Sequence, residues 1–545
     1  MNSALLKKYT ERLDWLHAVA PHAGAQYPQL APQLVAPAPG AVDPHVERLI
    51  EGIAYLAGRV DLKLESQELR VAHDLLTAVV PGSEKPIPSA GVVRFELEPN
   101  SAVSAAGVRI GRDTRHQARV EGSKKTCTYR VVSDQQLLPI RVQRCCLVPS
   151  DGRGGVLEVH LDTTHGHEWS SVSSATDTPL VLHLTDGGES MWSLYDLMTA
   201  PRTRVTGTAT EEAHAQALVA EAAGFDAGAS MFSRQDLGIE SDRLVQEYLA
   251  FPERFAAVAI HGWQDAAQAA AGSLILRFEI DSFDEHLARA IDDDSLALNC
   301  AACVNLFERR MDPILHSQRV HEYQVQPDRA NPQDFEVHTI CSVAAMTKEL
   351  ESIDVDGLYA DVVRQAGRIP GFMTRRSARV RSEAERRRGA RTSYAGSDVF
   401  LAWVDAPEHE QRPVPYTLSV VSLVTNRDLP LLVRRGATGS DLEADGIDGL
   451  QSIRFVHGPT PPRPPRILAT SAMAASTMVA AARAPISCSK GKHVLQTRWS
   501  ALAPHGMRQA ESVIDGIIEV SVAKASRVVG ARSRRAMVTG STATV

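Results

Sequence analysis

The sequence predicts a multidomain α+β protein, with an N-terminal helical segment followed by β-rich domains. Its 545 residues are too many for one hydrophobic core. Apolar residues follow a helical period up to about residue 80, and a period of two begins near residue 91. Hydrophobic residues make up 44% and charged residues 23% of the chain, which is ordinary for a soluble globular protein.

The N-terminal segment carries three helical patterns, and the clearest spans 43–64. Asp43 suits an N-cap and Pro44 suits the first helical position, where a missing N–H costs nothing. We expect one apolar face of this helix to be buried, and Leu49 lies on it. The other residues of that face are Val46, Ile50, Ile53, Leu56, Val60 and Leu64.

The other two helices flank this one. The first carries a stripe of four residues, Leu5, Tyr9, Leu13 and Leu16. The third begins at Ser66 as its N-cap and ends before Pro81-Gly82. Residues 31–42 are rich in Pro and Ala, which predicts a connector.

The β-rich part begins with strict alternation. Val93, Phe95 and Leu97 alternate with charged residues, which predicts a half-buried strand. Short helices are expected at 194–198 and 211–222, and mixed strands and loops over 296–340. Further strands are predicted at 126–132, 138–147, 156–162, 179–185, 274–280, 398–404 and 416–424.

These patterns divide the chain into six regions. Eight arginines between residues 375 and 391, with almost no large apolar residues among them, make 368–395 an expected linker or exposed arm. The regions are a helical segment (1–90), a β-rich domain (91–200), a mixed α/β domain (201–367), the Arg-rich linker (368–395), a β-rich segment (396–465) and an atypical C-terminal region (466–545).

Composition excludes several classes of protein. A net charge of −7 and an aromatic content of 5% argue against a nucleic-acid binder. Seven irregularly spaced cysteines are not a disulfide framework and suit a reducing compartment. No signal peptide or membrane-spanning run is expected, because charges interrupt the N-terminus and the nearest apolar stretch, 467–482, is short and polar. We therefore expect a cytoplasmic protein.

Two motifs resemble metal sites. Cys300 and Cys303 have zinc-knuckle spacing, but no second pair follows, and only His338 and Cys341 lie near them in sequence. The apolar surroundings of Cys300 favour a core role. His165 and His167 lie in a turn without a third ligand, so the pattern favours a solvated loop. We expect no metal.

No catalytic or cofactor-binding residue is predicted. The chain has no P-loop and no dinucleotide-binding fingerprint. Residues 188–192, around Ser190, approach a nucleophile elbow without its closing glycine. The acidic run 292–294 is typical of a solvated cap. The sequence therefore predicts neither an enzyme nor a cofactor.

Some residues leave alternatives open. The arginines of 375–391 could bind phosphates or dock on an acidic partner, and the missing aromatic residues weigh against nucleic acid. Asn426 and Arg427 fit either a polar turn or a contact site. Four aromatic residues suit core and interface packing better than a cofactor box: Tyr248, Phe251, Phe255 and Trp263.

Several blocks of sequence, taken in order, resemble one known family. The densest are 43–64 and Gln-Glu-Tyr-Leu-Ala-Phe-Pro-Glu-Arg-Phe at 246–255. The remaining blocks are Tyr9 to Leu16 with Tyr27-Pro28, 85–89, 296–300 with 304–307, 322–323 with 327–329 and 334–337, 396–400, 425–430 and 459–461. By these blocks the chain resembles the TssF family, also called ImpG or VasA, of type VI secretion baseplates.

This resemblance implies a structural role in a contractile injection system. Two TssF copies would join TssG in a wedge, and TssK and TssE would attach. The wedges would surround the VgrG hub, support the tail tube and contractile sheath, and dock on the inner-membrane complex, without nucleic acid and without direct membrane insertion. The alternatives are a degenerate, non-functional TssF and a basic-arm nucleic-acid-binding protein.

The resemblance is interrupted after Pro465. The family's Trp-Arg-Leu-Ile-Ser-His-Leu helix is absent, and Ala, Ser, Met and Arg fill residues 467–485 instead. Family-like sequence returns at 514–520. Losing several large buried side chains would cost about 2–5 kcal/mol each. We therefore expect 466–500 to be poorly ordered, in a C-terminal region that is degenerate and truncated relative to the family.

Overall fold

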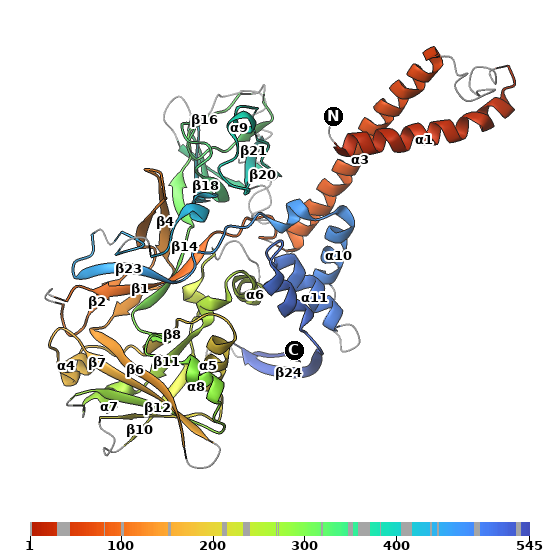
Figure 1. Cartoon of the computed structure of the whole chain (residues 1–545). Helices are drawn as coiled ribbons and strands as arrows, with labels where there is room; N and C mark the ends of the chain where they lie inside the picture. Colours follow the sequence, from red (N-terminus) through yellow and green to blue (C-terminus); the bar gives the residue numbers. More distant parts are fainter. Residues whose placement is uncertain are drawn as a thin grey trace. The chain divides into compact units, whose positions relative to one another are not determined.

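The chain forms two compact units, which are described separately. Unit 1 combines Met1–Val80 with Thr470–Pro485, and unit 2 combines Pro81–Ala469 with Ile486–Val545. Figure 1 shows the ribbon of this computed structural model. The structure describes residues 3–29, 44–80, 82–99, 103–150, 154–209, 215–232, 240–268, 270, 272–317, 320–346, 352–357, 371–381, 383–404, 417–436, 439–443, 446–483, 491–529 and 536–544.

Unit 1 consists of three helices, α1 (Ser3–Gln26), α3 (Pro44–Val79) and α10 (Ala472–Arg483). Pro44 is the first residue of α3, as predicted, while Asp43 and the connector 31–42 lie outside the described residues. The two helices expected over 43–79 are one helix of 36 residues. Ser66 does not cap a new helix, because its hydroxyl donates back to the Lys63 carbonyl at 2.7 Å.

Helix α3 packs on α1 through small residues. Ala54 and Gly58 are buried there, and a Cβ on Gly58 would lie 3.1 Å from the Tyr9 nitrogen. Ion pairs flank this contact, with Arg12 Nε 2.5 Å from Asp61 and Lys8 Nζ 2.7 Å from Glu65. The close approach of two backbones therefore depends on residues without bulky side chains.

The first sheet of unit 2 has five strands and is closed by a short bridging segment. Leu442 pairs with Ala118 at one edge and with Ile453 at the other, so the strands enclose a core around Phe95 and Tyr129. In order the strands are β23 (Leu450–His457), β1 (Ala90–Leu97), β14 (Cys300–Val304), β4 (Thr126–Val131) and β3 (Arg115–Arg119). Strands β2 (Val108–Ile110) and β5 (Gln135–Leu137) form a separate antiparallel pair.

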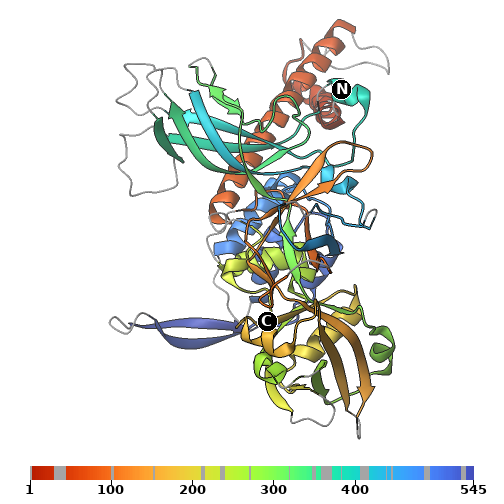
Figure 2. The same cartoon turned by 90° about the vertical axis from the view of Figure 1, so that its left-hand side faces the viewer.

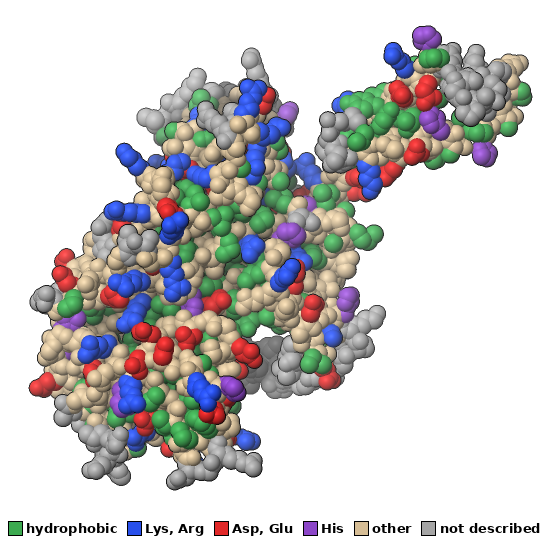
Figure 3. All heavy atoms as spheres, in the orientation of Figure 1, with side chains coloured by type: hydrophobic (Ala, Val, Ile, Leu, Met, Phe, Trp, Pro, Cys, Tyr) green, Lys and Arg blue, Asp and Glu red, His purple; other side chains and the backbone are tan. Residues whose placement is uncertain are grey.

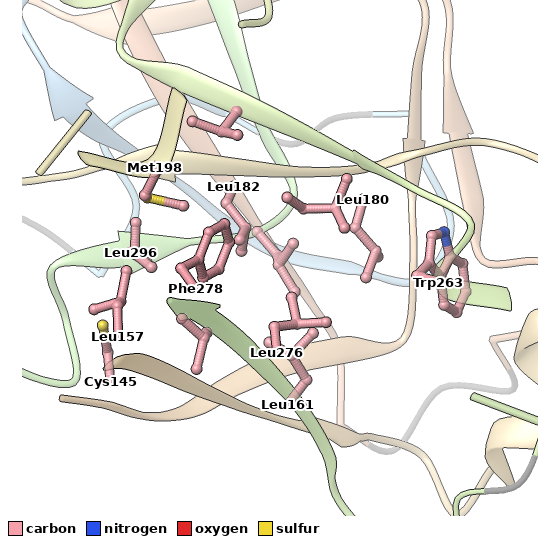
Figure 4. Close-up of a cluster of buried hydrophobic side chains, with 14 of the residues drawn as sticks. Cys145, Leu157, Leu161, Leu180, Leu182, Met198, Trp263, Leu276, Phe278 and Leu296 are labelled. Atoms are coloured by element: carbon pink, nitrogen blue, oxygen red, sulfur yellow. The ribbon is translucent and has the colours of Figure 1, made fainter. Parts of the chain in front are cut away.

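The second sheet has eight strands and the largest core. Figure 4 shows Phe278 among Leu182, Leu276 and Leu296. The strands are, in order, β13 (Leu296–Ala297), β8 (Leu180–Leu184), β11 (Ala257–His261), β10 (Gln216–Ala222), β9 (Arg204–Thr208), β12 (Leu274–Ile280), β7 (Gly155–Thr163) and β6 (Ile140–Pro149). Its helices are α4 (Trp169–Ser174), α5 (Glu189–Thr199), α7 (Trp263–Gln268) and α8 (Glu285–Ala290).

The third sheet is antiparallel except for the pairing of β19 with β20. Its strands are, in order, β15 (Phe307–Arg310), β22 (Thr417–Thr425), β18 (Glu336–Met346), β19 (Ser352–Gly357), β20 (Gly371–Ala378), β21 (Ser397–Val404) and β17 (Glu322–Gln324), with β16 (Ile314–Leu315) beside β22. Buried valines and leucines such as Val343, Leu401 and Val420 fill its core.

Helices at the C-terminal side of unit 2 pack on a helix from its middle. Leu249 of α6 (Glu240–Ala250) meets Ala503, Ala510 and Ile514 from α11 (Gly491–Leu502), α12 (Arg508–Asp515) and the turn between them. Strands β24 (Ser521–Val529) and β25 (Ala536–Thr544) form a hairpin (Figure 2). The short helices are η1 (Ala227–Ala229), η3 (Pro252–Phe255), α9 (Glu383–Arg388), η5 (Leu429–Leu432) and η6 (Arg466–Ala469).

The structure corrects three predictions. Residues 216–222 form strand β10 between β9 and β11, not the expected helix. The expected linker 368–395 contains strand β20 and helix α9. The segment 466–500, which was expected to be poorly ordered, contains helix α10 and most of α11. The strands predicted from alternation are confirmed, and among the described helices none is long and apolar enough to cross a membrane.

Candidate functional site: polar junctions and an exposed apolar helix face

The two cysteines with zinc-knuckle spacing point to opposite faces of strand β14. Cys300 packs in one core cluster and Cys303 in another. Burial raises the pKa of the Cys300 thiol to about 12 and also raises the pKa of Cys303. Residues three apart on a strand cannot converge on one ion. Over the residues that the structure describes, no group of three or more His, Cys, Asp or Glu could hold a metal.

The histidine pair serves to anchor a loop. His165 Nε2 donates to the Glu98 carbonyl at 2.8 Å, and His167 Nε2 donates to the Val103 carbonyl at 2.8 Å. Both contacts reach the segment after β1. The two histidines lie in a turn, as predicted, but their rings bond to backbone carbonyls of another segment.

The acidic run also has a structural role. Asp293 accepts the N–H of Cys145 on edge strand β6 at 3.0 Å. Asp292 accepts from the Ser295 hydroxyl at 3.0 Å. Ser190, in the sequence that resembles a nucleophile elbow, lies in the first turn of α5 after Gly188, whose φ is 89°. These groups hold turns and cap strands.

The arginines of 375–391 make contacts within unit 2. Arg375 lies 2.5 Å from Glu322, and Arg379 lies 2.9 Å from Glu385. Arg376 donates to the His338 carbonyl at 2.7 Å. Every arginine of this run whose side chain the structure describes has such a partner: Arg375, Arg376, Arg379, Arg381, Arg386, Arg387 and Arg391. Four of these arginines, Arg375, Arg379, Arg387 and Arg391, therefore pair with carboxylates, while the other three bond to uncharged oxygens.

A polar junction forms where three separate sequence blocks meet, 334–337, 394–397 and 425–428. Glu336 is 2% exposed and accepts from the Ser397 N–H at 2.7 Å, the Ser397 hydroxyl at 2.5 Å and the Tyr394 hydroxyl at 2.8 Å. Burial first, then the Glu336 charge, raises the pKa of Tyr394 well above its usual value. A buried carboxylate with this many donors fixes the turn before β21.

The same junction includes Arg427 and Gly396. Arg427 has a φ of 53° and donates to the Ala395 carbonyl at 3.2 Å and the Gln333 carbonyl at 3.0 Å. Gly396 has a φ of 78°, and a Cβ there would lie 3.2 Å from both Arg427 Nε and Glu336 Oε2. Of the two roles open to Arg427, the structure shows a buried polar turn.

Asn426 connects the first and third sheets. Its amide oxygen accepts from the Thr128 N–H and from Asn305 Nδ2, both at 2.8 Å, and its own N–H donates to Asn305 at 2.7 Å. Thr128 belongs to β4, while Asn426 follows β22. This exchange between two buried asparagines fixes the orientation of one sheet on the other.

Asp428 completes the junction through ion pairs. Arg391 lies 2.5 Å from Asp428 and 2.9 Å from Asp334, and Lys125 lies 2.6 Å from Asp334. Burial alone would lower the pKa of Arg391, but hydrogen bonds to Asp428 and Asp334 outweigh it and raise the pKa. The C-terminal part of the predicted arm is thus held on the domain.

A second polar network surrounds Glu247 of α6. Glu247 is fully buried and accepts from the Ser230 hydroxyl at 2.8 Å and the Met231 N–H at 3.0 Å, and it pairs with Arg243 and Arg254. Burial first, and then the charge of Arg243, lowers the pKa of Arg254 to about 9. Glu247 and Arg254 belong to the block 246–255, and their network fixes the segment before α6 onto α6 and η3.

The apolar face of α3 is not part of a core in unit 1, which corrects the expectation that it is buried. Leu49 is 66% exposed and Leu56 is 59% exposed. Figure 3 shows hydrophobic side chains on the surface of the α1–α3 pair. The exposed side chains on this stripe, called here the α3 face, are Leu49, Ile53, Leu56, Val60, Leu64, Val71 and Leu75. Exposed apolar patches of this kind mark contact sites.

Sequence reasoning missed how these residues meet. Asn426 and Glu336 are ordinary polar residues in sequence, and their partners lie tens to hundreds of positions away. A signal was present for Gly396 and Gly58, because glycines inside patterned segments often mark close approach.

Buried polar junctions between sheets and an exposed apolar helix face are typical of structural proteins that assemble with other proteins. The family model described as Type VI secretion system, TssF, matches residues 1–545. The chain belongs to the TssF family. It is 32% identical over 485 residues to the type VI secretion system component TssF1 of Pseudomonas aeruginosa, covering 86% of this chain and 78% of that protein.

Two solved structures share the fold. A chain of the TssK–TssF–TssG baseplate subcomplex, solved by cryo-electron microscopy, has a TM-score of 0.67 and 19% identity, over 91% of this chain and 88% of that one. A chain of the type VI secretion baseplate complex has a TM-score of 0.51 and 16% identity, over 99% of this chain and 89% of that one. At these identities the likeness concerns the fold.

Proposed function

We propose that this chain is a structural wedge subunit of the type VI secretion baseplate. The observation that carries the proposal is the α3 face, because seven large apolar side chains of one helix are exposed to solvent in this chain. Burying them against partner helices would gain about 25 cal/mol for each Å² of apolar surface. The family membership identifies the machine in which such partners occur.

The proposed partners are TssG, TssK, TssE and a second copy of this chain. The wedge formed with them would surround the VgrG hub, support assembly of the tail tube and contractile sheath, and dock at the inner membrane through the membrane complex. The likeness in fold to a chain of the solved TssK–TssF–TssG subcomplex supports the choice of TssG and TssK. The chain contributes rigid interfaces in this role and no catalysis.

The polar junction supports a role in transmitting force between domains. Force passes between domains only when their relative orientation is fixed, and buried hydrogen-bonded networks specify one arrangement. Asn305 and Asn426 join two sheets in this way. The basic-arm alternative loses support, since Arg375 and Arg391 of this run pair with carboxylates of the same unit.

Co-expression with TssG, followed by size-exclusion chromatography, tests the proposal. We expect a complex that contains both proteins, whereas the chain alone should self-associate through the α3 face. A well-behaved monomer that does not bind TssG would contradict a wedge role. A salt-dependent gel shift with DNA would instead favour the nucleic-acid alternative.

A further inference from the structure

Five of the chain's few aromatic residues gather at one place in unit 2. Trp192 and Tyr195 come from α5, Tyr248 from α6, Phe255 from η3, and Phe225 from the segment after β10. The ring centroids of Phe225 and Phe255 are 4.9 Å apart, those of Tyr248 and Phe255 are 5.9 Å apart, and those of Trp192 and Tyr195 are 5.7 Å apart. These five residues are called the aromatic row.

The aromatic row is only partly covered. Within it Phe255 is buried, whereas Phe225 is 48% exposed and Tyr248 is 37% exposed. Trp192 and Tyr195 are half-buried. Rigid aromatic side chains dominate the centres of protein interfaces, because they bury a large area at a small entropic cost.

A hollow of about 260 Å³ opens beside the row. It is smaller than the roughly 300–1,000 Å³ of ordinary small-molecule pockets, so it fits one or two side chains better than a cofactor. Its lining is almost entirely apolar and consists of Trp192, Tyr248, Leu249, Pro252, Ala510 and Val513, with Gln509.

Two carboxylates adjoin the residues of this hollow. Asp196 follows Tyr195, whose ring packs on that of Trp192, and Glu253 follows Pro252 of the lining. Burial first, and then the charges of these two groups, raises the pKa of Tyr248. Asp196 is exposed and Glu253 is half-buried. Among the described residues, neither forms an ion pair. The nearby basic groups Arg243 and Arg254 are buried and bound to Glu247.

Helix α12 does not reverse this negative balance. It carries one basic residue, Arg508, and two acidic ones, Glu511 and Asp515. An apolar cavity with an acidic rim selects partners that carry both apolar and positive groups, since like charges at a rim repel and opposite charges steer.

We propose that the hollow beside the aromatic row is a docking site for a partner peptide segment with an aliphatic side chain next to Lys or Arg. The aliphatic group enters between Trp192, Tyr248 and Val513. The basic group pairs with Asp196 and Glu253. The acidic rim disfavours nucleic acid and acidic segments. Binding of either one at this site would therefore contradict the proposal. The site does not require the wedge role to be correct.

Fluorescence anisotropy with three labelled Gly/Ser peptides of equal length tests this proposal on the whole chain. One peptide carries a central Leu-Lys-Arg-Leu, one Leu-Glu-Glu-Leu and one Ser-Lys-Arg-Ser. We expect saturable binding of the first and at least about tenfold weaker binding of the other two, because both the apolar and the basic contacts are needed.

Variants then locate the site. The double variant Asp196→Asn/Glu253→Gln is expected to weaken binding of the Leu-Lys-Arg-Leu peptide about tenfold and to remove its salt dependence. Val513→Arg, at a position 37% exposed, is expected to abolish binding by filling the hollow with a like charge. Asp281→Asn, an exposed carboxylate outside the lining, is the matched control and should change nothing.

Four outcomes would overturn the proposal. They are no saturable binding of the Leu-Lys-Arg-Leu peptide up to millimolar concentration, equal binding of either comparison peptide, unchanged binding by the double variant or by Val513→Arg, and competition by a single-stranded oligonucleotide.

Discussion

At the level of single residues, the polar junction depends on one glycine. Gly396 combines a φ of 78° with a Cβ position 3.2 Å from Arg427 Nε and Glu336 Oε2. Any side chain would both strain the backbone and crowd two buried charged groups. The turn between Tyr394 and Ser397 therefore has little freedom to change.

We predict that Gly396→Ala destabilises the protein more than Gly389→Ala. Both glycines have positive φ, at 78° and 82°, but a Cβ on Gly389 would meet nothing within 4 Å. Backbone strain alone should cost about 1 kcal/mol, and crowding at Gly396 should add about 1–3 kcal/mol. Thermal unfolding of the two variants measures the difference. Equal unfolding temperatures would show that the junction accommodates the added methyl group without extra loss of stability.

We also predict that the purified protein contains no stoichiometric zinc, because Cys300 and Cys303 point into different cores. Elemental analysis after purification without chelators measures this. About one zinc per chain, lost in Cys303→Ser, would contradict the prediction.

Residue-level prediction from sequence was uneven for a physical reason. Core cysteines and apolar strand residues were assigned from their neighbours, since burial follows local alternation. Asn426 and Arg427 could not be assigned, because their roles are set by Asn305, Thr128 and Gln333, which are distant in sequence. Polar satisfaction is a tertiary property.

At the level of elements, α3 shows how periodicity can identify a helix without identifying what covers it. The apolar spacing of 43–64 was real, but the α1–α3 contact uses Ala54 and Gly58 on another face. Small residues allow the helices to approach closely and leave the larger side chains outside. An amphipathic pattern alone does not distinguish a core from an interface.

We predict that Leu49→Asp leaves the stability of the isolated chain almost unchanged but prevents its association with TssG. Leu49 is 66% exposed, so a charge there stays hydrated in the free chain. In an interface it would be desolvated at a cost of several kcal/mol. Ser66→Asp, which adds the same charge elsewhere on exposed α3, is the control. If Leu49→Asp associates normally, the α3 face is not the partner surface.

Strand β10 shows the limit of local propensity. Residues 211–222 are rich in Ala, Glu and Gln, which favour a helix. Residues 216–222 nevertheless pair with β9 and β11 on both sides. Pairing with two neighbours outweighs a preference of a few tenths of a kcal/mol per residue. Arg375 and Arg376 were misassigned similarly, since their acidic and carbonyl partners are distant in sequence.

A buried histidine in strand β8, His183, should make the free energy of unfolding depend on pH. Burial first, and then the nearby His457, lowers the pKa of His183 to about 4. Below pH 6.5 the unfolded chain binds a proton that the folded chain excludes, so the free energy of unfolding should fall by about 3 kcal/mol between pH 6.5 and 4. Burial also lowers the pKa of His116 and His338, which adds in the same direction.

Chemical denaturation of the wild type and of His183→Gln between pH 7 and 4 measures this contribution. The variant should lose less stability over that range, whereas His286→Gln, at an exposed position, should follow the wild type. A wild-type curve that stays flat between pH 6.5 and 4 would contradict the pKa shift.

At the level of the whole molecule, the two units combine parts that are distant in sequence. Helix α10 belongs with α1 and α3, while α11 and α12 belong with the β-sheets. The sequence predicted a change of character after Pro465 and an unordered segment over 466–500. It could not predict the helices there, because α10 is stabilised by contacts of small residues such as Ala475, and α11 by packing on α6.

The packing of α11 and α12 on α6 predicts the behaviour of a cleaved chain. Leu249 meets Ala503, Ala510 and Ile514 in one cluster, and Arg498 lies 2.8 Å from Asp242. These contacts should hold the C-terminal fragment after the chain is cut between the units. We therefore insert a specific protease site between Pro485 and Ile486 and expect both fragments to co-elute in size-exclusion chromatography after cleavage.

Ile514→Asp, 3% exposed in the wild type, should release the C-terminal fragment, since a buried unpaired charge costs several kcal/mol. Ser512→Asp, at an exposed position on the same helix, should not. If the wild-type fragments separate, or if residues 491–515 are digested as soon as the site is cut, the segment does not pack as part of unit 2. That result would again support the expectation of a degenerate C-terminal region. Helices that contribute nothing to the stability of unit 2 could lose their large side chains without destabilising the protein.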